Sequence, residues 1–441
     1  MTTIPKTTLV PRHRSRPWKS HAPDAHVLPT YRRAEEVFVA GDGALVHDSG
    51  GRVWLDFLSG IAVNALGHAH PRLVRALRDQ AGKLLHTSNL YRHPYTEEVA
   101  SRLARLTGLS SVFFTNSGAE ANEAAMKLAR KRAWLAGEKE RTGFVALEGA
   151  FHGRTMGALA LTHAEKYRLP YAPLVPGVEF VAPGNVARLG ALLATGRFAA
   201  LFVEPIQGEA GVRELPADFL RAARELCDAS GTLLVHDEVQ CGAGRTGTFL
   251  AADACGVKPD AVTLAKPLAA GLPMGSLVVR AELASVFEPG DHGSTFAGGP
   301  FVCRAALVFL DELERGGLLE NVRERGAELS AGLLDLARDF PVVTGLSGRG
   351  LMLGLRLARG AEELQKDLHE RGLLVNRTNG DVIRLLPPYV VTSEHVQRGL
   401  SLLRQALREL GSPRACSIPP LRELGSRGAR SVPPSKDPSL P

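Results

Sequence analysis

The sequence is poor in cysteine and contains no long apolar run. Its cysteines number five, an odd count, and none of them forms a C-x-x-C pair. This pattern argues against a zinc site or a disulfide framework and indicates reduced thiols in a reducing compartment. No apolar stretch reaches the roughly 18 residues that a membrane span needs. The N-terminus lacks the apolar centre of a secretory signal, so we expect a cytoplasmic protein with no membrane partner.

Acidic residues are absent from the first 23 positions, and the net charge of +7 is concentrated at the two ends of the chain. Residues 1–33 carry seven Lys/Arg and one acid, and residues 411–441 carry five Lys/Arg and two acids, which leaves −2 for the rest. A near-neutral body argues against nucleic acid as a partner. Residues 1–27 and 411–441 are rich in proline and lack periodicity, so we expect disordered tails. The alternative for the first tail is a transit peptide to an organelle matrix.

The body of the chain shows the pattern of an α/β protein. Hairpin signals over 37–55 are followed by amphipathic helices that alternate with continuous apolar strands from 96 to 279. Such strands predict a mostly parallel sheet covered on both faces. After the helix at 301–313 the pattern of predicted elements changes, and short strands mixed with helices indicate a smaller α+β unit. We therefore expect an N-terminal segment over 28–75, a large domain over 76–311 and a small domain over 312–410.

Polar residues stand at the carboxyl ends of these predicted strands, where ligands bind in such sheets. Thr115, Glu204, Asp237 and Lys266 all lie at or just beyond a strand end. A buried ammonium at Lys266 is costly, and an imine with a carbonyl compound relieves that cost. Lysines near strand ends also reach solvent, so this residue alone does not decide between the two.

Four further features each have both an ordinary structural explanation and a functional one, and only their combination favours a function. Ser117 and Gly118 open a helix after a strand, as at a phosphate site, although the same pattern caps a helix that binds only water. Asp237 suits a protonated ring nitrogen or a salt bridge. Phe151 suits stacking on a flat ring or a place in the core, and Arg154 suits a carboxylate or solvent. The loop 293–299, with two hydroxyls, suits phosphate or carboxylate but is also ordinary in composition. In combination they indicate pyridoxal 5′-phosphate (PLP).

Several motifs resemble those of the class-III (ω-) aminotransferases, and the resemblance covers roughly residues 28–408. They lie at 116–122, 151–155, 203–209, 237–240, 264–275 and 292–296. Residues 59–68 and 86–91 are most similar to the subgroup that acts on acetylornithine. The resemblance implies the fold type I architecture of PLP enzymes, with a mostly parallel seven-stranded sheet and a smaller α+β domain. It also implies transfer of the terminal amino group of N2-acetyl-L-ornithine to 2-oxoglutarate in arginine biosynthesis.

The resemblance further implies individual roles. Lys266 binds the cofactor aldehyde, Asp237 holds the ring proton, Gln240 contacts the ring hydroxyl and Phe151 stacks on the ring. Thr295 reaches the phosphate of a neighbouring subunit, which implies a homodimer. The implied cofactor set is Ser117, Gly118, Ala119, Phe151, Asp237, Glu238, Val239, Gln240, Lys266 and Thr295. The implied substrate set is Arg154 and Arg384 as carboxylate clamps, Glu209 as a gate that pairs with Arg384, Ser294 and Tyr31. No metal is implied.

Two positions depart from the family pattern. Pro267 restricts the backbone of the preceding residue, which is Lys266, away from the right-handed helical region. Ile61 stands where ornithine aminotransferases typically carry a tyrosine, and an apolar residue favours an acylated donor. Free ornithine, succinylornithine and a carrier-linked lysine precursor remain alternative donors. The sequence is also compatible with an aminomutase on the same fold and with a non-enzymatic protein that binds the cofactor or nucleic acid.

Overall fold

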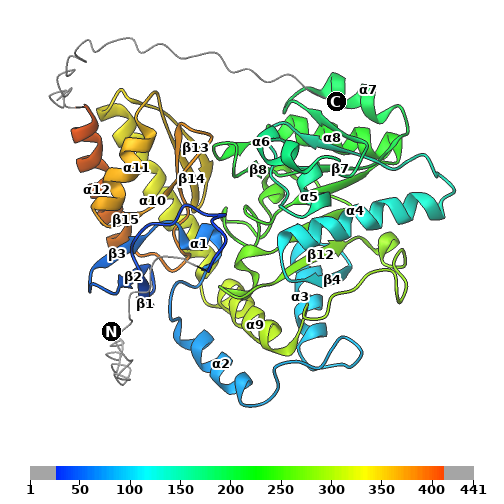
Figure 1. Ribbon diagram of the computed structural model, residues 1–441, viewed down its shortest axis with the longest axis horizontal. Coiled ribbons are helices and arrows are strands. Elements are labelled where there is room, and N and C mark those ends of the chain that lie inside the picture. Colours follow the sequence, from blue (N-terminus) through cyan, green and yellow to red (C-terminus); the bar gives the residue numbers. More distant parts are fainter. Residues whose placement is uncertain (1–25, 412–441) are drawn as a thin grey trace, which may run out of the picture.

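The computed structural model describes residues 26–411, and the predictions for residues 1–25 and 412–441 lie outside the described residues. The chain forms two lobes that lie side by side (Figure 1). One lobe is built around a seven-stranded sheet, and the other combines the beginning and the end of the described chain. No helix in this range is long and apolar enough to cross a membrane.

The seven-stranded sheet is mixed but mostly parallel, which confirms the predicted architecture. Its order is β4 (Ser111–Thr115), β12 (Gly275–Val279), β11 (Ala261–Leu264), β10 (Leu233–Asp237), β7 (Phe198–Val203), β5 (Gly143–Leu147) and β6 (Val178–Val181). Only β12 runs antiparallel to its neighbours. Every residue of β5, β7, β10 and β11 is buried, as expected for strands covered on both faces.

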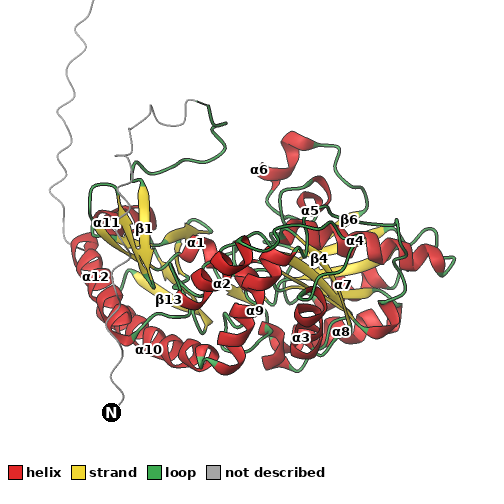
Figure 2. Cartoon of the chain, turned by 90° about the horizontal axis from the view of Figure 1, so that it is seen from below, coloured by secondary structure: helices red, strands yellow, loops and turns green. Residues whose placement is uncertain are grey.

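Helices cover both faces of this sheet (Figure 2). On one face, α4 (Gly118–Leu135) packs on β11 and β12 through a row of small buried side chains that includes Ala121, Ala124 and Ala125. On the other face, α7 (Val186–Leu193) and α8 (Ala217–Ser230) share an apolar cluster with β7 and β10. The alanines let α4 approach the sheet closely, which brings its first turn to the carboxyl ends of the strands.

The smaller lobe contains two four-stranded sheets. One has the order β13 (Val343–Arg349), β14 (Met352–Leu357), β17 (Val382–Leu385) and β16 (Asn376–Thr378). The other has the order β1 (Phe38–Asp42), β2 (Leu45–Asp48), β3 (Val53–Asp56) and β15 (Leu373–Leu374). Residues 373–378 are divided between the two sheets, because β15 pairs with β3 and β16 pairs with β17.

The remaining elements connect and cover these sheets. In the small lobe, α10 (Leu318–Asp339) packs on β13 and on α12 (Ser393–Gly411), and α11 (Ala361–Glu370) packs on α12. Between the lobes, α9 (Pro300–Arg315) packs against α2 (Pro71–Ala81) and α3 (Thr96–Thr107). The short elements are α1 (Ser59–Ala62), α5 (Met156–Ala160), α6 (Glu165–Arg168), η1 (Leu169–Tyr171), β8 (Ile206–Gln207), β9 (Arg213–Glu214), η2 (Ala251–Cys255), η3 (Lys266–Ala269) and η4 (Ala281–Leu283).

Candidate active site

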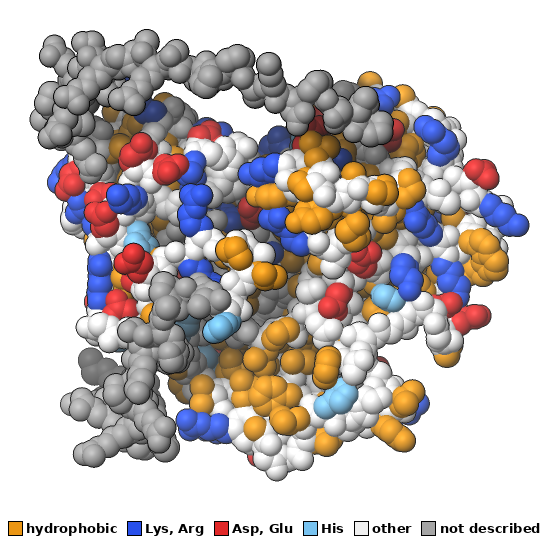
Figure 3. Space-filling model, viewed as in Figure 1, with side chains coloured by type: hydrophobic (Ala, Val, Ile, Leu, Met, Phe, Trp, Pro, Cys, Tyr) orange, Lys and Arg blue, Asp and Glu red, His pale blue; other side chains and the backbone are white. Residues whose placement is uncertain are grey.

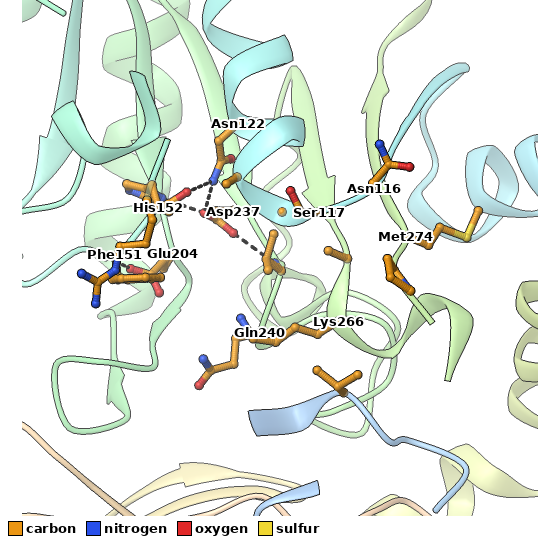
Figure 4. A pocket seen from close by; sticks show the side chains of 18 of the residues that line it. Asn116, Ser117, Asn122, Phe151, His152, Glu204, Asp237, Gln240, Lys266 and Met274 are labelled. Carbon is orange, nitrogen blue, oxygen red and sulfur yellow. Dashed lines mark hydrogen bonds and ion pairs between the residues drawn. The ribbon is translucent and has the colours of Figure 1, made fainter. Parts of the chain in front are cut away.

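A cavity of about 430 Å³ lies beyond the carboxyl ends of the central strands (Figure 4). Its wall brings together Glu204 after β7, Asp237 at the end of β10 and Lys266 after β11, although these residues are far apart in the sequence. Thr115, the fourth strand-end residue, is not in the lining, and its hydroxyl donates to the carbonyl of Ser117 at 2.9 Å. Because the carboxyl ends of parallel strands meet at one edge of the sheet, the fold brings these titratable groups together in the cavity.

Lys266 is the first residue of the 3₁₀ helix η3, and its side chain lines the cavity. Among residues 26–411, its Nζ makes no hydrogen bond or ion pair. Burial lowers the pKa of Lys266 and the charge of Arg384 lowers it further, while Asp237 and Glu209 oppose this shift. Pro267 is accommodated as the second residue of η3, where its carbonyl accepts from the Ala270 N–H at 3.0 Å. A desolvated amine without a partner is a good nucleophile toward a carbonyl group.

Asp237 is held rigidly by three donors. Its Oδ2 accepts from Asn122 Nδ2 and from His152 Nδ1, each at 2.7 Å, and its Oδ1 accepts from the Val239 N–H at 3.1 Å. Asn122 is fixed in turn by the Thr263 hydroxyl at 2.9 Å. Burial opposes a charge on His152, but the hydrogen bond and charge of Asp237 outweigh it and raise the histidine pKa. The arrangement keeps a buried carboxylate in place opposite any protonated ring nitrogen in the cavity.

The beginning of α4 forms a cradle suited to an anion. The Ser117 hydroxyl caps the helix by accepting from the Glu120 N–H at 3.2 Å, and Gly118 and Ala119 follow in its first turn. A Cβ on Gly118 would lie 2.6 Å from Val239 Cγ1, so the backbone approaches the opposite wall more closely than any other residue allows. The free N–H groups and dipole of an 18-residue helix meet the cavity at this point.

These features fit pyridoxal phosphate. The unpartnered Lys266 amine suits the aldehyde, the Asp237 carboxylate suits the ring nitrogen, and the glycine-containing start of α4 suits the phosphate. Phe151 also lines the cavity and supplies an aromatic face. The four contacts come from four separate loops that follow strands of one sheet.

Two arginines face the cavity region from different lobes. Arg154 lines the cavity, and its Cζ lies 3.8 Å from the ring centroid of Tyr167 and 5.4 Å from that of Phe151. Arg384, on β17, is only 1% exposed and bonds Glu209 Oε1 at 2.6 Å through its Nη1. Burial raises the pKa of Glu209, but the arginine outweighs this effect and lowers it.

The remaining residues of the sequence-based site set lie at different distances from the cavity. Gln240 lines it and accepts from Arg384 at 3.0 Å, and Ser294 accepts from Asn116 Nδ2 at 2.9 Å. Glu238 lies beside the cavity lining but points elsewhere, because its carboxylate accepts from the N–H groups of Ala251 and Ala252. Thr295 and Tyr31 are exposed and do not contribute to the lining within this chain.

Sequence reasoning gave no role in the site to Asn122, His152 or Glu204. Glu204 is 5% exposed, accepts from the Phe151 N–H at 2.8 Å, and has a pKa raised to about 7 by burial. Its position at a strand end was a signal for it. The signal for Asn122 was a polar residue on the alanine-rich buried face of α4. The only signal for His152 was its position next to Phe151 in the sequence.

Comparisons with known proteins agree with this chemistry. The family model described as aminotransferase class-III matches residues 30–407. An acetylornithine aminotransferase of Aquifex aeolicus is 44% identical over 383 residues, which cover 87% of this chain and 100% of that protein. A mitochondrial acetylornithine aminotransferase of Alnus glutinosa is 45% identical over 388 residues, which cover 87% of this chain and 86% of that protein.

Solved structures show the same fold. An ornithine aminotransferase of Toxoplasma gondii, with partial occupancy of PLP at its active site, superposes with a TM-score of 0.84 at 33% identity, covering 87% of this chain and 92% of that one. An N-acetylornithine aminotransferase of Stenotrophomonas maltophilia gives a TM-score of 0.76 at 35% identity, covering 86% of this chain and 97% of that one.

Proposed function

This chain belongs to the class-III aminotransferases, which are PLP-dependent, and we propose that it transfers the terminal amino group of N2-acetyl-L-ornithine to 2-oxoglutarate. The products are N-acetyl-L-glutamate 5-semialdehyde and L-glutamate, and the step belongs to arginine biosynthesis. The observation that carries the choice of donor is the 40–45% identity to acetylornithine aminotransferases from bacteria, an archaeon and a plant, which extends over 87% of the chain.

The proposed chemistry divides between cofactor and protein. When bound, PLP supplies an aldehyde for amines and an electron-withdrawing ring. Lys266 would hold the aldehyde, and its Nζ would move a proton at the donor carbon. Its lowered pKa, caused by burial, leaves the amine free to accept that proton. Asp237, fixed by Asn122 and His152, keeps the proton on the ring nitrogen.

Two arginines explain how one cavity takes two different substrates. Arg154 is open to the cavity and suits the carboxylate of the donor. Arg384 is paired with Glu209 at 2.6 Å, so its charge is neutralised while the donor is bound. The dicarboxylate acceptor engages Arg384 once Glu209 moves away. The half-exposed side chain of Glu209, at 40%, has room for such a movement, whereas Arg384, at 1%, does not.

Free ornithine is the second candidate donor, since an ornithine aminotransferase is among the similar solved structures. Ile61 lies 41% exposed in a segment with positive φ, and the cavity wall is formed instead by its neighbour Val63. An apolar wall at this point offers no hydroxyl to a free α-amino acid end. Succinylornithine and a carrier-linked lysine precursor share the acylated end and are compared in the same assay.

We further propose a cytoplasmic homodimer. Large apolar side chains are exposed next to the loop that carries Thr295, among them Leu90 at 87%, Tyr91 at 73% and Phe296 at 69%. A second copy covering this surface would bury them and bring Thr295 to the cradle of the other subunit. The organelle matrix is the alternative location, since one relative is named mitochondrial.

A donor panel tests the proposed function. The holoenzyme is assayed for glutamate formed from 2-oxoglutarate with acetylornithine, succinylornithine, ornithine and a carrier-linked lysine precursor. We expect the highest kcat/KM with acetylornithine and no turnover when 2-oxoglutarate is omitted. Equal values for acetylated and free ornithine would contradict the choice of donor, and turnover without the acceptor would indicate an aminomutase.

A further inference from the structure

A second cavity, of about 730 Å³, opens beside the first, and most of its lining has no part in the chemistry described above. One side is formed by the large lobe, through residues 148–151, 162–167 and 209–213, and the other by residues 377–380 of the small lobe. Phe151 and Glu209 line both cavities, so the two adjoin. We call this second cavity the tail crevice. Figure 3 shows Lys and Arg side chains along the hollow between the two lobes.

The tail crevice carries an excess of positive charge. Its lining contains Lys166, Arg213 and Arg377 against two acids, Glu148 and Glu209. Glu209 pairs at 2.6 Å with Arg384 of β17, as Arg377 does with a glutamate outside the lining, so the lining keeps an excess of one cation. Arg377 pairs with an exposed glutamate at 2.7 Å on its outer side, and the guanidinium of Arg213 bonds Gln207 and the backbone carbonyl of Glu148.

Lys166 is the least committed of these cations. Within residues 26–411 its Nζ makes no hydrogen bond or ion pair and lies 4.8 Å from the ring centroid of Tyr167. Arg154 lies 3.8 Å from the same ring, and Arg154 lines the first cavity while Tyr167 lines the tail crevice. Both cations thus lie against the ring of Tyr167, Arg154 from the lining of the first cavity and Lys166 from that of the tail crevice. Gln365 and Asn379 add amide groups to the wall.

We propose that the tail crevice binds the acylamino end of the donor while its terminal amine lies at Lys266, an inference that rests on the proposed function. A neutral acylamino group leaves the carboxylate as the only charge at that end, and the excess of cations attracts it. Free ornithine carries an additional α-ammonium there, which the same cations repel. The crevice is therefore the element that selects an acylated donor over free ornithine, with Lys166 as the specificity-determining residue.

Binding of unreactive analogues separates this selection from the chemistry. N-acetyl-L-norvaline and L-norvaline match the two donors but lack the terminal amine. Calorimetry uses the enzyme loaded with pyridoxamine 5′-phosphate, which has no aldehyde for the α-amine of L-norvaline to attack, so it reports binding of the tail alone. We expect wild type to bind the acetylated analogue at least about tenfold more tightly. Lys166→Glu changes the local charge by two units, which at about 8 Å in water lowers that ratio about fivefold. Lys166→Gln lowers it by about half as much on a logarithmic scale.

Lys139→Glu is the matched control, because Lys139 is an exposed lysine of the large lobe that lies beyond the C-terminal end of α4, outside both cavities. It makes the same charge change and should leave the ratio unaltered. An equal ratio in Lys166→Glu and Lys139→Glu, with the cofactor absorbance intact in both, would overturn the proposal. If wild type forms glutamate from acetylornithine but Lys166→Glu leaves the affinity ratio unchanged, only the proposal for the tail crevice is contradicted. Wild type that forms no glutamate from any ornithine donor defeats the proposed function.

Discussion

The replacement Glu204→Gln probes the most perturbed acid of the active site. Glu204 is 5% exposed and close to His152 and Asp237, and burial raises its pKa from 4.5 to about 7. Glutamine keeps an oxygen to accept the Phe151 N–H, which lies 2.8 Å from the carboxylate. The variant therefore removes the titration with little change in shape, and it reports directly on the electrostatics around the cofactor site.

The sign and size of the effect follow from the raised pKa. The pKa of Glu204 is higher in the folded state than in the unfolded state. Its contribution to the stability of the fold is therefore fully present below about pH 4.5 and is lost as the pH rises through 7. Between pH 5 and pH 8 the loss is about 2–3 kcal/mol, since one pKa unit corresponds to about 1.36 kcal/mol. His236 acts with the opposite sign, because burial lowers its pKa to about 3 and the fold gains stability as the pH rises from 3 to 6.5. Comparing wild type with the variant cancels that contribution.

Infrared spectroscopy of the cofactor-free protein measures the titration itself, through the carbonyl stretch of protonated carboxyl groups. Glu238 also has a pKa raised to about 7 by burial, so wild type should show two such groups that ionise near neutrality. Glu204→Gln should leave one, and urea unfolding at pH 5 and pH 8 should show the stability difference reduced by about 2–3 kcal/mol. An unchanged band at pH 5 in the variant would refute the reasoning, since Glu204 would then be ionised at that pH.

Three further predictions concern the cofactor and the acceptor. Lys266→Ala should lower kcat at least about 10⁴-fold while circular dichroism shows an intact fold, and residual turnover above that level would contradict its role. Gly118→Ala places a Cβ 2.6 Å from Val239 Cγ1, so spectrophotometric titration should show weaker PLP binding that Val239→Ala restores in the double variant; no rescue would contradict a steric cause. Arg384→Gln removes a charge-assisted contact and should raise the KM for 2-oxoglutarate about 10- to 100-fold, with a smaller change in the donor half-reaction in stopped-flow absorbance; an equal loss in both half-reactions would contradict its assignment to the acceptor.

The central sheet and the position of the cavity follow from local patterns. Continuous apolar strands such as Phe198–Val203 require cover on both faces, and parallel strands place their carboxyl ends at one edge. Lys266, Asp237 and Glu204 could therefore be placed near one another without any contact being known. The Ser117 cap was recognisable for the same reason, because an N-cap is a local interaction between residues three apart.

The partners of Asp237 could not be predicted in this way. Asn122 and His152 lie 115 and 85 positions from it in the sequence, and their contacts exist only after α4 has docked on the sheet. The same applies to the division of residues 373–378 between two sheets, since β15 is recruited by Leu55 and Asp56 from the other end of the chain. No periodicity within a strand of two residues specifies such a distant pairing.

The residues that line the tail crevice could not be brought together from the sequence either. Lys166 and Tyr167 occupy the short helix α6, whose sequence carries no motif, and Arg377 belongs to the other lobe. Only the folded chain places them around one cavity, which shares Phe151 with the lining of the active site. Charge selection of this kind depends on which residues meet across the two lobes, and that information is not local.

Chemical trapping of the cofactor tests the central claim most directly. Holoenzyme is treated with borohydride, which reduces an imine to a stable secondary amine, and is then digested and mapped by mass spectrometry. The account predicts one modified lysine, Lys266, carrying the mass of the reduced cofactor, with loss of the visible absorbance. A label on any other lysine, or no label in protein that retains bound cofactor, would contradict it.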